Sequence, residues 1–191
     1  MYSLIEIKEL NENTGAHLFQ FSQWMKGSGV APHEVFSVSK LAIEQQSNKL
    51  SVYVISQAGS AVGYLALFLG LESIRISRLN FFTISPSLRG EGQGKDILLS
   101  CLRHLMMEVD VTSVACHESL VGFYKACGFD HVGKADNGDE LLLFSLFPID
   151  NPEAVIKERV ALVGYDGSFK EQYTKLEKLV LGARPDLSCV C

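Results

Sequence analysis

The fold of this chain is decided by Leu79-Asn-Phe-Phe-Thr-Ile-Ser-Pro-Ser-Leu-Arg-Gly-Glu-Gly-Gln-Gly-Lys95. An apolar run rich in β-formers ends at Pro86, and an R-x-x-G-x-G pattern then leads into an amphipathic helix. Glycine has no Cβ, so its backbone can curl and approach a bound anion closely. The unpaired N–H groups of a first helical turn point at such an anion, and the helix dipole favours it. This stretch predicts a strand, a phosphate-binding turn and a helix, in that order.

The overall composition is that of an ordinary globular protein. The chain has 191 residues, of which 47% are hydrophobic and 20% are charged, and its net charge is −5. This length suits one domain with a substantial core plus an appendage. The chain contains no block of lysine and arginine and no run of about 18 apolar residues. Residues 1–8 alternate like a strand and do not resemble a signal peptide. We therefore expect a cytoplasmic protein that binds neither nucleic acid nor membrane.

The five cysteines fit reduced thiols better than a disulfide framework, because their number is odd and their spacing irregular. Buried reduced cysteines act as small hydrophobic side chains. The pair Cys189-Val-Cys191 could bind a metal or oxidise, but no cluster of further ligands accompanies it. We expect no metal site.

Hydrophobic periodicity predicts the order β-α-α-β-β-β-α-β-α-β-β, a mixed α/β chain with one strand–helix–strand crossover flanked by hairpins. The expected strands are 3–9, 50–56, 61–69, 78–85, 111–116, 129–134 and 141–147, and the expected helices are 14–26, 32–48, one after Gly92 and one after Ser119. Two short amphipathic helices are expected beyond these, over about 152–163 and 168–182. We therefore expect a core domain over residues 1–147 and a C-terminal helical extension over residues 148–191.

Two other phosphate-binding loops do not fit the glycine-rich stretch. A Walker loop would need glycine at Arg89 and serine or threonine at Asp96. A dinucleotide-binding fingerprint starting at Gly90 would need glycine at Lys95. On the glycines alone, a plain turn that only reverses the chain stays open as an alternative.

Two motifs together resemble the GCN5-related N-acetyltransferase (GNAT) family. The first is Ile84-x-Pro-x-x-Arg-Gly-x-Gly-x-Gly94, which is similar to the family's acyl-CoA-binding motif, and the second is Phe123-Tyr-Lys-Ala-Cys-Gly-Phe129. The resemblance covers about residues 3–147. It implies a mixed, mostly antiparallel sheet that is splayed at its centre, with acetyl-CoA as cosubstrate in the gap between the strands that end near Pro86 and Cys116.

The resemblance also implies which residues bind the cosubstrate. The strand before Pro86 would pair through its backbone with the thioester arm. The amides from Arg89 to Lys95 would wrap the diphosphate. Whether the Arg89 charge contributes or is simply solvated is left open. The implied cofactor-binding residues are Phe82, Thr83, Ile84, Arg89, Gly90, Glu91, Gly92, Gln93, Gly94 and Lys95.

Acetyl transfer to an amine needs a proton donor for the departing thiolate and a route for the proton that the amine loses. By the resemblance, Tyr124 is the general acid, since a phenol can protonate a thiolate. A core aromatic with a satisfied hydroxyl is the alternative for Tyr124. His117 lies where the family often has asparagine, and its titration range suits a proton relay. A polar residue at a strand end is the alternative for His117.

The general base is not evident, because Asn80 and Phe81 stand where many family members have a carboxylate. Neither side chain accepts a proton at neutral pH. His33, Glu34, Glu72 and Glu118 are other candidates, and water could also carry the proton. An acyl-enzyme on Cys116 is disfavoured, since the family generally transfers directly.

The resemblance places the acceptor near the first two helices and the loop before strand 78–85. The implied substrate-binding residues are Trp24, Phe36, Glu72 and Asn80. We therefore expect an N-acetyltransferase acting on a small-molecule or peptide amine. A catalytically silent module that binds a CoA thioester is the alternative, and a structural domain that recruits a protein through residues 152–182 is a third interpretation. A homodimer is left open.

Overall fold

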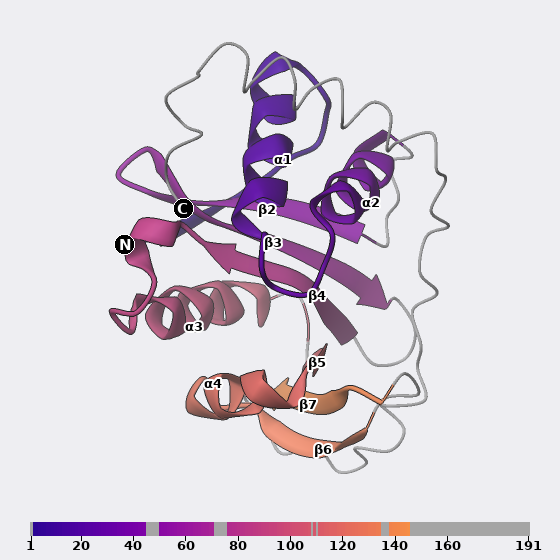
Figure 1. Cartoon of the computed structure of the whole chain (residues 1–191), viewed down its shortest axis with the longest axis vertical. Coiled ribbons are helices and arrows are strands. Elements are labelled where there is room, and N and C mark those ends of the chain that lie inside the picture. The colour runs from indigo at the N-terminus through magenta and orange to yellow at the C-terminus, as the bar shows by residue number, and fades with distance from the viewer. Residues whose placement is uncertain are drawn as a thin grey trace.

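The computed structural model of the chain describes residues 2–44, 50–70, 76–107, 109, 111–134 and 138–145. Within these residues, seven strands form one sheet in the order β1-β2-β3-β4-β5-β7-β6, with helices on both faces (Figure 1). Neighbouring strands run antiparallel except β4 and β5, which are parallel and are joined by a crossover through α3. The predicted mixed α/β fold with a mostly antiparallel sheet is confirmed.

The elements follow the predicted order and agree with the predicted ranges to within a few residues. They are β1 (Tyr2–Glu6), α1 (Glu12–Trp24), α2 (Pro32–Glu44), β2 (Leu50–Gln57), β3 (Ser60–Gly70), β4 (Ile76–Ile84), the 3-10 turn η1 (Pro86–Leu88), α3 (Gln93–Leu105), β5 (Val111–Cys116), the 3-10 turn η2 (Glu118–Leu120), α4 (Val121–Ala126), β6 (Asp130–Lys134) and β7 (Glu140–Ser145).

The sheet splays between β4 and β5. Only Ile76–Leu79 of β4 pairs with β5, against Val111–Val114. Beyond Leu79, β4 continues along β3 alone, while β5 continues along β7. The register between β3 and β4 shifts at Asn80, which is the extra residue of a β-bulge, and a bulge bends its strand and increases the local twist. Residues Asn80–Ile84 therefore carry an edge that no strand in the described chain covers, and we call it the open edge of β4.

Buried hydroxyl groups hold the two strands together where they are paired. The Ser77 and Thr112 hydroxyls are hydrogen-bonded at 2.8 Å, and neither residue is exposed. The Ser113 hydroxyl donates to the Ser77 carbonyl at 3.3 Å. Because a buried hydroxyl is costly unless it is bonded, these contacts favour one register at the root of the splay.

Each face of the sheet has its own hydrophobic core. Tyr64 and Ala66 of β3 belong to the core beneath α1 and α2, whereas Leu65 and Leu67 belong to the core beneath α3 and α4. This follows from the alternation of side chains along a strand. Figure 1 shows the two pairs of helices on opposite sides of β2–β4. The two cores meet the splay from opposite faces, so both layers of helices can contribute to a site there.

Local signals set some helix boundaries that periodicity alone misplaced. Helix α1 starts before the predicted residue 14, because Asn11 and Thr14 form a capping box: the Thr14 amide donates to Asn11 Oδ1 at 3.0 Å, and the Asn11 amide donates to Thr14 Oγ1 at 2.8 Å. The extension over residues 148–191, with its predicted helices, lies outside the described residues. In the described ranges, none of the helices has the length and apolar character needed to cross a membrane.

Candidate functional site

The predicted phosphate-binding turn is a loop at the surface, which we call the phosphate loop (Arg89–Lys95). Gly90 and Gly92 have φ values of 83° and 78°, in the left-handed region. In this conformation, a residue with a Cβ would cost about 1–2 kcal/mol of conformational energy, so the backbone path requires glycine. Gly90, Glu91 and Gly92 are exposed, and α3 begins directly after them.

The main-chain amides of the phosphate loop are available to a ligand. After η1, the next main-chain hydrogen bond runs from the Lys95 amide to the Gly92 carbonyl at 3.2 Å. Across the described chain, no carbonyl or side chain accepts a hydrogen bond from the amides of Gly90 through Gly94. The dipole of the 13-residue helix α3 adds positive potential at the same place. These amides therefore have the exposure and the unused donors that a diphosphate needs.

The open edge of β4 presents main-chain groups beside this loop. The Ser85 amide donates to the Val62 carbonyl at 2.9 Å, so Ile84 and its partner in β3 form a non-hydrogen-bonded pair. Because the pattern repeats every second residue, Phe82 and Ile84 direct their N–H and C=O groups away from β3, whereas Thr83 directs its own toward β3. An extended ligand could add to this edge as a further strand.

Gly94, in the first turn of α3, lies beside the end of β4 and beside α4. A Cβ at this position would lie 3.4 Å from Ile84 Cδ1 and 3.6 Å from Phe123 Cε2, which are ordinary van der Waals distances. The start of α3 is therefore close to both elements, although the space at Gly94 does not itself require glycine.

Stacked aromatic side chains line the splay on the face that carries α3 and α4. Phe82 of β4 stacks on Phe123 of α4, with ring centroids 6.3 Å apart and planes 17° apart. Phe123 meets Tyr124 edge-on at 5.2 Å, and Tyr124 meets Phe129 edge-on at 5.3 Å. We call Phe82, Phe123, Tyr124 and Phe129 the aromatic wall. It connects β4 to α4 across the place where β4 and β5 diverge.

Tyr124 is buried, but its hydroxyl is not used by the protein. The residue is 8% exposed, and no group in the described part of the chain hydrogen-bonds to its hydroxyl. Burial, and secondarily the nearby thiols of Cys116 and Cys127, raise the pKa of Tyr124 well above its ordinary value. The phenol is therefore protonated at neutral pH and can donate to a ligand.

The Arg89 side chain turns away from the phosphate loop. Its Nη2 donates to the Trp24 carbonyl, to Thr83 Oγ1 at 3.1 Å and to the Ile84 carbonyl at 3.3 Å, and its Nε donates to the same Ile84 carbonyl at 3.4 Å. The Thr83 hydroxyl donates in turn to the Trp24 carbonyl at 3.2 Å. The Arg89 guanidinium is thus neither simply solvated nor directed toward the phosphate loop. The sequence contained no signal for this contact, since the two partners are 65 residues apart.

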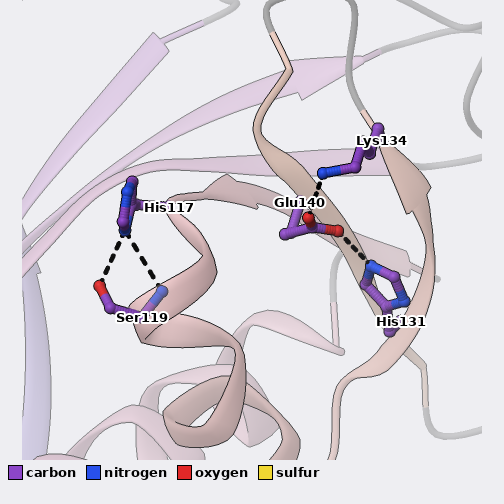
Figure 2. A network of polar contacts seen from close by, with 5 residues as sticks. All are labelled: His117, Ser119, His131, Lys134 and Glu140. Atoms are coloured by element: carbon purple, nitrogen blue, oxygen red, sulfur yellow. Dashed lines mark hydrogen bonds and ion pairs between the residues drawn. The ribbon is translucent and has the colours of Figure 1, made fainter.

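His117 directly follows β5 and caps η2 with its side chain (Figure 2). The Ser119 amide donates to His117 Nδ1 at 3.3 Å, and the Ser119 hydroxyl lies 3.0 Å from the same nitrogen. Because Nδ1 accepts from an amide, the neutral ring carries its proton on Nε2. The exposed ring therefore offers a hydrogen-bond donor.

A cross-strand cluster that the sequence analysis did not identify lies near His117 (Figure 2). Glu140 of β7 contacts His131 Nε2 at 2.6 Å and also pairs with Lys134, both of β6. The Lys134 hydrogen bond, followed by that of His131, holds the pKa of Glu140 below its ordinary value. Glu140 faces Cys116 in the strand register, and burial together with the Asp139 and Glu140 charges raises the pKa of that thiol. A protonated thiol is a poor nucleophile, which agrees with direct transfer.

The expected acceptor residues have different surroundings. Trp24, at the end of α1, is half-buried with its ring 5.2 Å from that of Tyr64, and Asn80 is half-buried at the bulge. Phe36 is only 6% exposed and belongs to the core beneath α1 and α2. Glu72 lies outside the described residues.

A splayed α/β sheet with a row of unused amides beside an open strand edge has the features that suit an extended, phosphate-bearing ligand. The profile of the family described as "Acetyltransferase (GNAT) domain" matches residues 23–145. The chain therefore belongs to the GNAT family, and it is an acetyl-CoA-dependent N-acetyltransferase with acetyl-CoA as its cosubstrate.

Solved acetyltransferase structures share this fold. The aminoglycoside acetyltransferase AAC(6')-Ib in complex with coenzyme A is 15% identical with a TM-score of 0.57, over 76% of this chain and 95% of its own. The ribosomal-protein-S18-alanine N-acetyltransferase from Escherichia coli is 13% identical with a TM-score of 0.53, over 79% and 98%. A mutant of the spermidine N-acetyltransferase SpeG from Vibrio cholerae is 14% identical with a TM-score of 0.56, over 75% and 93%. Among curated protein sequences, none matches the chain.

Proposed function

We propose that this enzyme moves the acetyl group of acetyl-CoA to a primary amine by direct attack of the amine on the thioester. The observation that carries the proposal is the set of unused amides from Gly90 to Gly94 beside the open edge of β4. These amides would hold the diphosphate, and the main-chain groups of Phe82 together with the amide of Ile84 would hold the extended arm, since the Ile84 carbonyl already accepts from Arg89. The arm would then lie against the aromatic wall that contains Tyr124.

Tyr124 acts as the general acid in this proposal. As the bond from the amine nitrogen to the acetyl carbon forms and the carbon–sulfur bond breaks, the departing thiolate takes the phenol proton. The raised pKa of Tyr124 keeps this proton in place at neutral pH, and the absence of a partner among the described residues leaves the hydroxyl free to reach a ligand. The proton that the amine loses restores the phenol through water.

His117 acts as a hydrogen-bond donor in this proposal. Its Nε2–H suits an oxygen atom that gains charge during acyl transfer. The proton relay expected from the sequence would require the ring to give up the Ser119 amide first, because Nδ1 is occupied. We therefore assign His117 to stabilisation of charge at the end of β5.

We place the amine acceptor on the side of the open edge where Trp24 and Asn80 lie. The structural neighbours include an aminoglycoside and a spermidine acetyltransferase, which supports an amine acceptor of the small-molecule or peptide class. The described residues supply no evident base, and positioning with water can account for the loss of the amine proton.

Binding and turnover test the proposal separately. Isothermal titration with acetyl-CoA measures binding, and release of free thiol measures transfer to a panel of polyamines, aminoglycosides, amino acids and peptides. We expect binding, and thiol release with at least one class of amine. Binding without release across the whole panel would favour the catalytically silent alternative. Failure to bind any CoA thioester would overturn the proposal.

The cytoplasmic location and the division into residues 1–147 and 148–191 stay predictions, and a homodimer stays open. Size-exclusion chromatography of the full chain with light scattering would decide the oligomeric state.

A further inference from the structure

One guanidinium joins two parts of the site that are far apart in sequence. Arg89 follows the turn η1 and directly precedes Gly90 of the phosphate loop. Its side chain donates to the Trp24 carbonyl at the end of α1 and to the Ile84 carbonyl at the end of β4. Thr83 Oγ1 lies between them, accepting from Arg89 at 3.1 Å and donating to Trp24 at 3.2 Å. We call Trp24, Thr83, Ile84 and Arg89 the Arg89 tie.

The Trp24 carbonyl needs a donor from outside its own helix. It lies in the last turn of α1, where carbonyls have no intrahelical partner, and no main-chain amide among the described residues donates to it. The last turn of α1 contains no basic residue, so Arg89 supplies the positive charge that a helix C-terminus favours. The Ile84 carbonyl, directed to the open edge of β4, likewise receives Arg89 in place of a neighbouring strand.

We propose that Arg89 is a positioning residue that couples cosubstrate binding to the acceptor side of the site. This inference rests on the proposed function. A diphosphate that orders the amides from Gly90 to Gly94 also fixes the main chain of Arg89, because the residues are contiguous. The fixed guanidinium then holds the end of α1, and with it Trp24, against β4. Coupling of this kind is reciprocal, so an ordered Trp24 also favours the loop that binds the diphosphate.

The protein contains a natural reporter for this coupling, since Trp24 is its single tryptophan. Free coenzyme A is the probe, its binding is followed by isothermal titration, and Trp24 is followed by emission and by acrylamide quenching. In the wild-type protein, we expect coenzyme A to lower the quenching of Trp24. In Arg89→Met and Arg89→Lys, we expect coenzyme A still to bind while the response of Trp24 is lost, because only the planar fork reaches all three acceptors.

Two further variants control the experiment. Arg103→Met removes an exposed arginine near the other end of α3 and should leave the Trp24 response unchanged. Thr83→Val removes the shared hydroxyl, preserves the arginine, and should weaken the response. This variant keeps the proposal testable if the Arg89 variants do not fold, as judged by circular dichroism.

Three results would overturn the inference. The first is a Trp24 response that persists in Arg89→Met or, where the Arg89 variants do not fold, at full size in Thr83→Val. The second is wild-type protein that binds coenzyme A with no change in Trp24. The third is an affinity for coenzyme A that falls about tenfold or more in Arg89→Met and is restored in Arg89→Lys. This result would mean that the positive charge at position 89 binds the diphosphate directly. Absence of any heat of binding in the wild-type protein would instead count against the proposed function.

Discussion

Substituting Gly92 by aspartate would place a fixed negative charge where the diphosphate is proposed to bind. Gly92 has a φ of 78°, and nothing lies within 4 Å of the position that its Cβ would take. The side chain therefore fits sterically, and the strain comes from the backbone alone, at about 1–2 kcal/mol. Gly92→Ala carries the same strain without the charge.

The electrostatic cost can be estimated from the exposure of the loop. Two unit charges about 4 Å apart repel by about 1 kcal/mol in water and by about 4 kcal/mol at the effective dielectric constant of a protein surface. Gly92 is exposed, so the loss of affinity should lie in this range, which corresponds to roughly fivefold to several-hundredfold in Kd. The same carboxylate interacts favourably with the N-terminus of α3, so stability should fall no further than in Gly92→Ala.

Isothermal titration with coenzyme A at low and high salt is the assay, with thermal unfolding measured in parallel. Gly59→Asp is the matched control, because Gly59 has a φ of 81° in the exposed turn between β2 and β3, also with nothing within 4 Å of a Cβ. We expect Gly59→Asp to bind like the wild-type protein. A Kd for Gly92→Asp equal to that of Gly92→Ala would refute the assignment of these amides to the diphosphate.

Three more variants test other parts of the structure. Tyr124→Phe should slow turnover by roughly 10²–10⁴-fold with unchanged coenzyme A affinity, and full activity in a steady-state assay would remove Tyr124 from the mechanism. The pKa of Glu140 is lowered in the folded state, so the stability it contributes is present above its ordinary pKa and is lost as the pH falls through the lowered value. The stability difference between Glu140→Gln and the wild-type protein in urea titrations should therefore shrink as the pH falls below the ordinary value of 4.5, and a pH-independent difference would contradict this. Ser77→Val leaves the buried Thr112 hydroxyl without its side-chain partner and should cost about 1–3 kcal/mol, and the double variant with Thr112→Val should recover part of it. A double variant that is less stable by the sum of the two single losses would show that the pair is not coupled.

Much of the fold could be predicted from local sequence patterns. Three such patterns are the alternation of apolar residues along β2 and β3, the helical spacing in α3 and the end of β4 before Pro86. Each pattern involves only residues close together in the sequence, so each can be recognised without knowing the tertiary contacts. The turn at Gly90 and Gly92 could be predicted for the same reason, because the ability to adopt a left-handed backbone conformation is a property of glycine itself. The start of α1 after Asn11 depends on the reciprocal hydrogen bonds between Asn11 and Thr14, which hydrophobic periodicity does not reveal.

The site was only partly predictable, because its polar contacts join distant segments. His131 and Lys134 reach Glu140 only after β6 and β7 pair with a shifted register, and no local pattern encodes that shift. The bulge at Asn80 likewise appears only when β3 is laid against β4. Phe36 was expected to bind the acceptor, but the packing of α2 on the sheet buries it.

The sequence by itself determined that a strand, a glycine turn and a helix would follow one another and leave a row of amide donors between Gly90 and Gly94, because torsion preference and missing Cβ atoms are local properties. Only the tertiary structure decided what those donors lie beside and where the Arg89 charge goes. A long, five-donor side chain takes whichever acceptors the fold brings within reach. In this chain, one of those acceptors is the carbonyl of a residue 65 positions away.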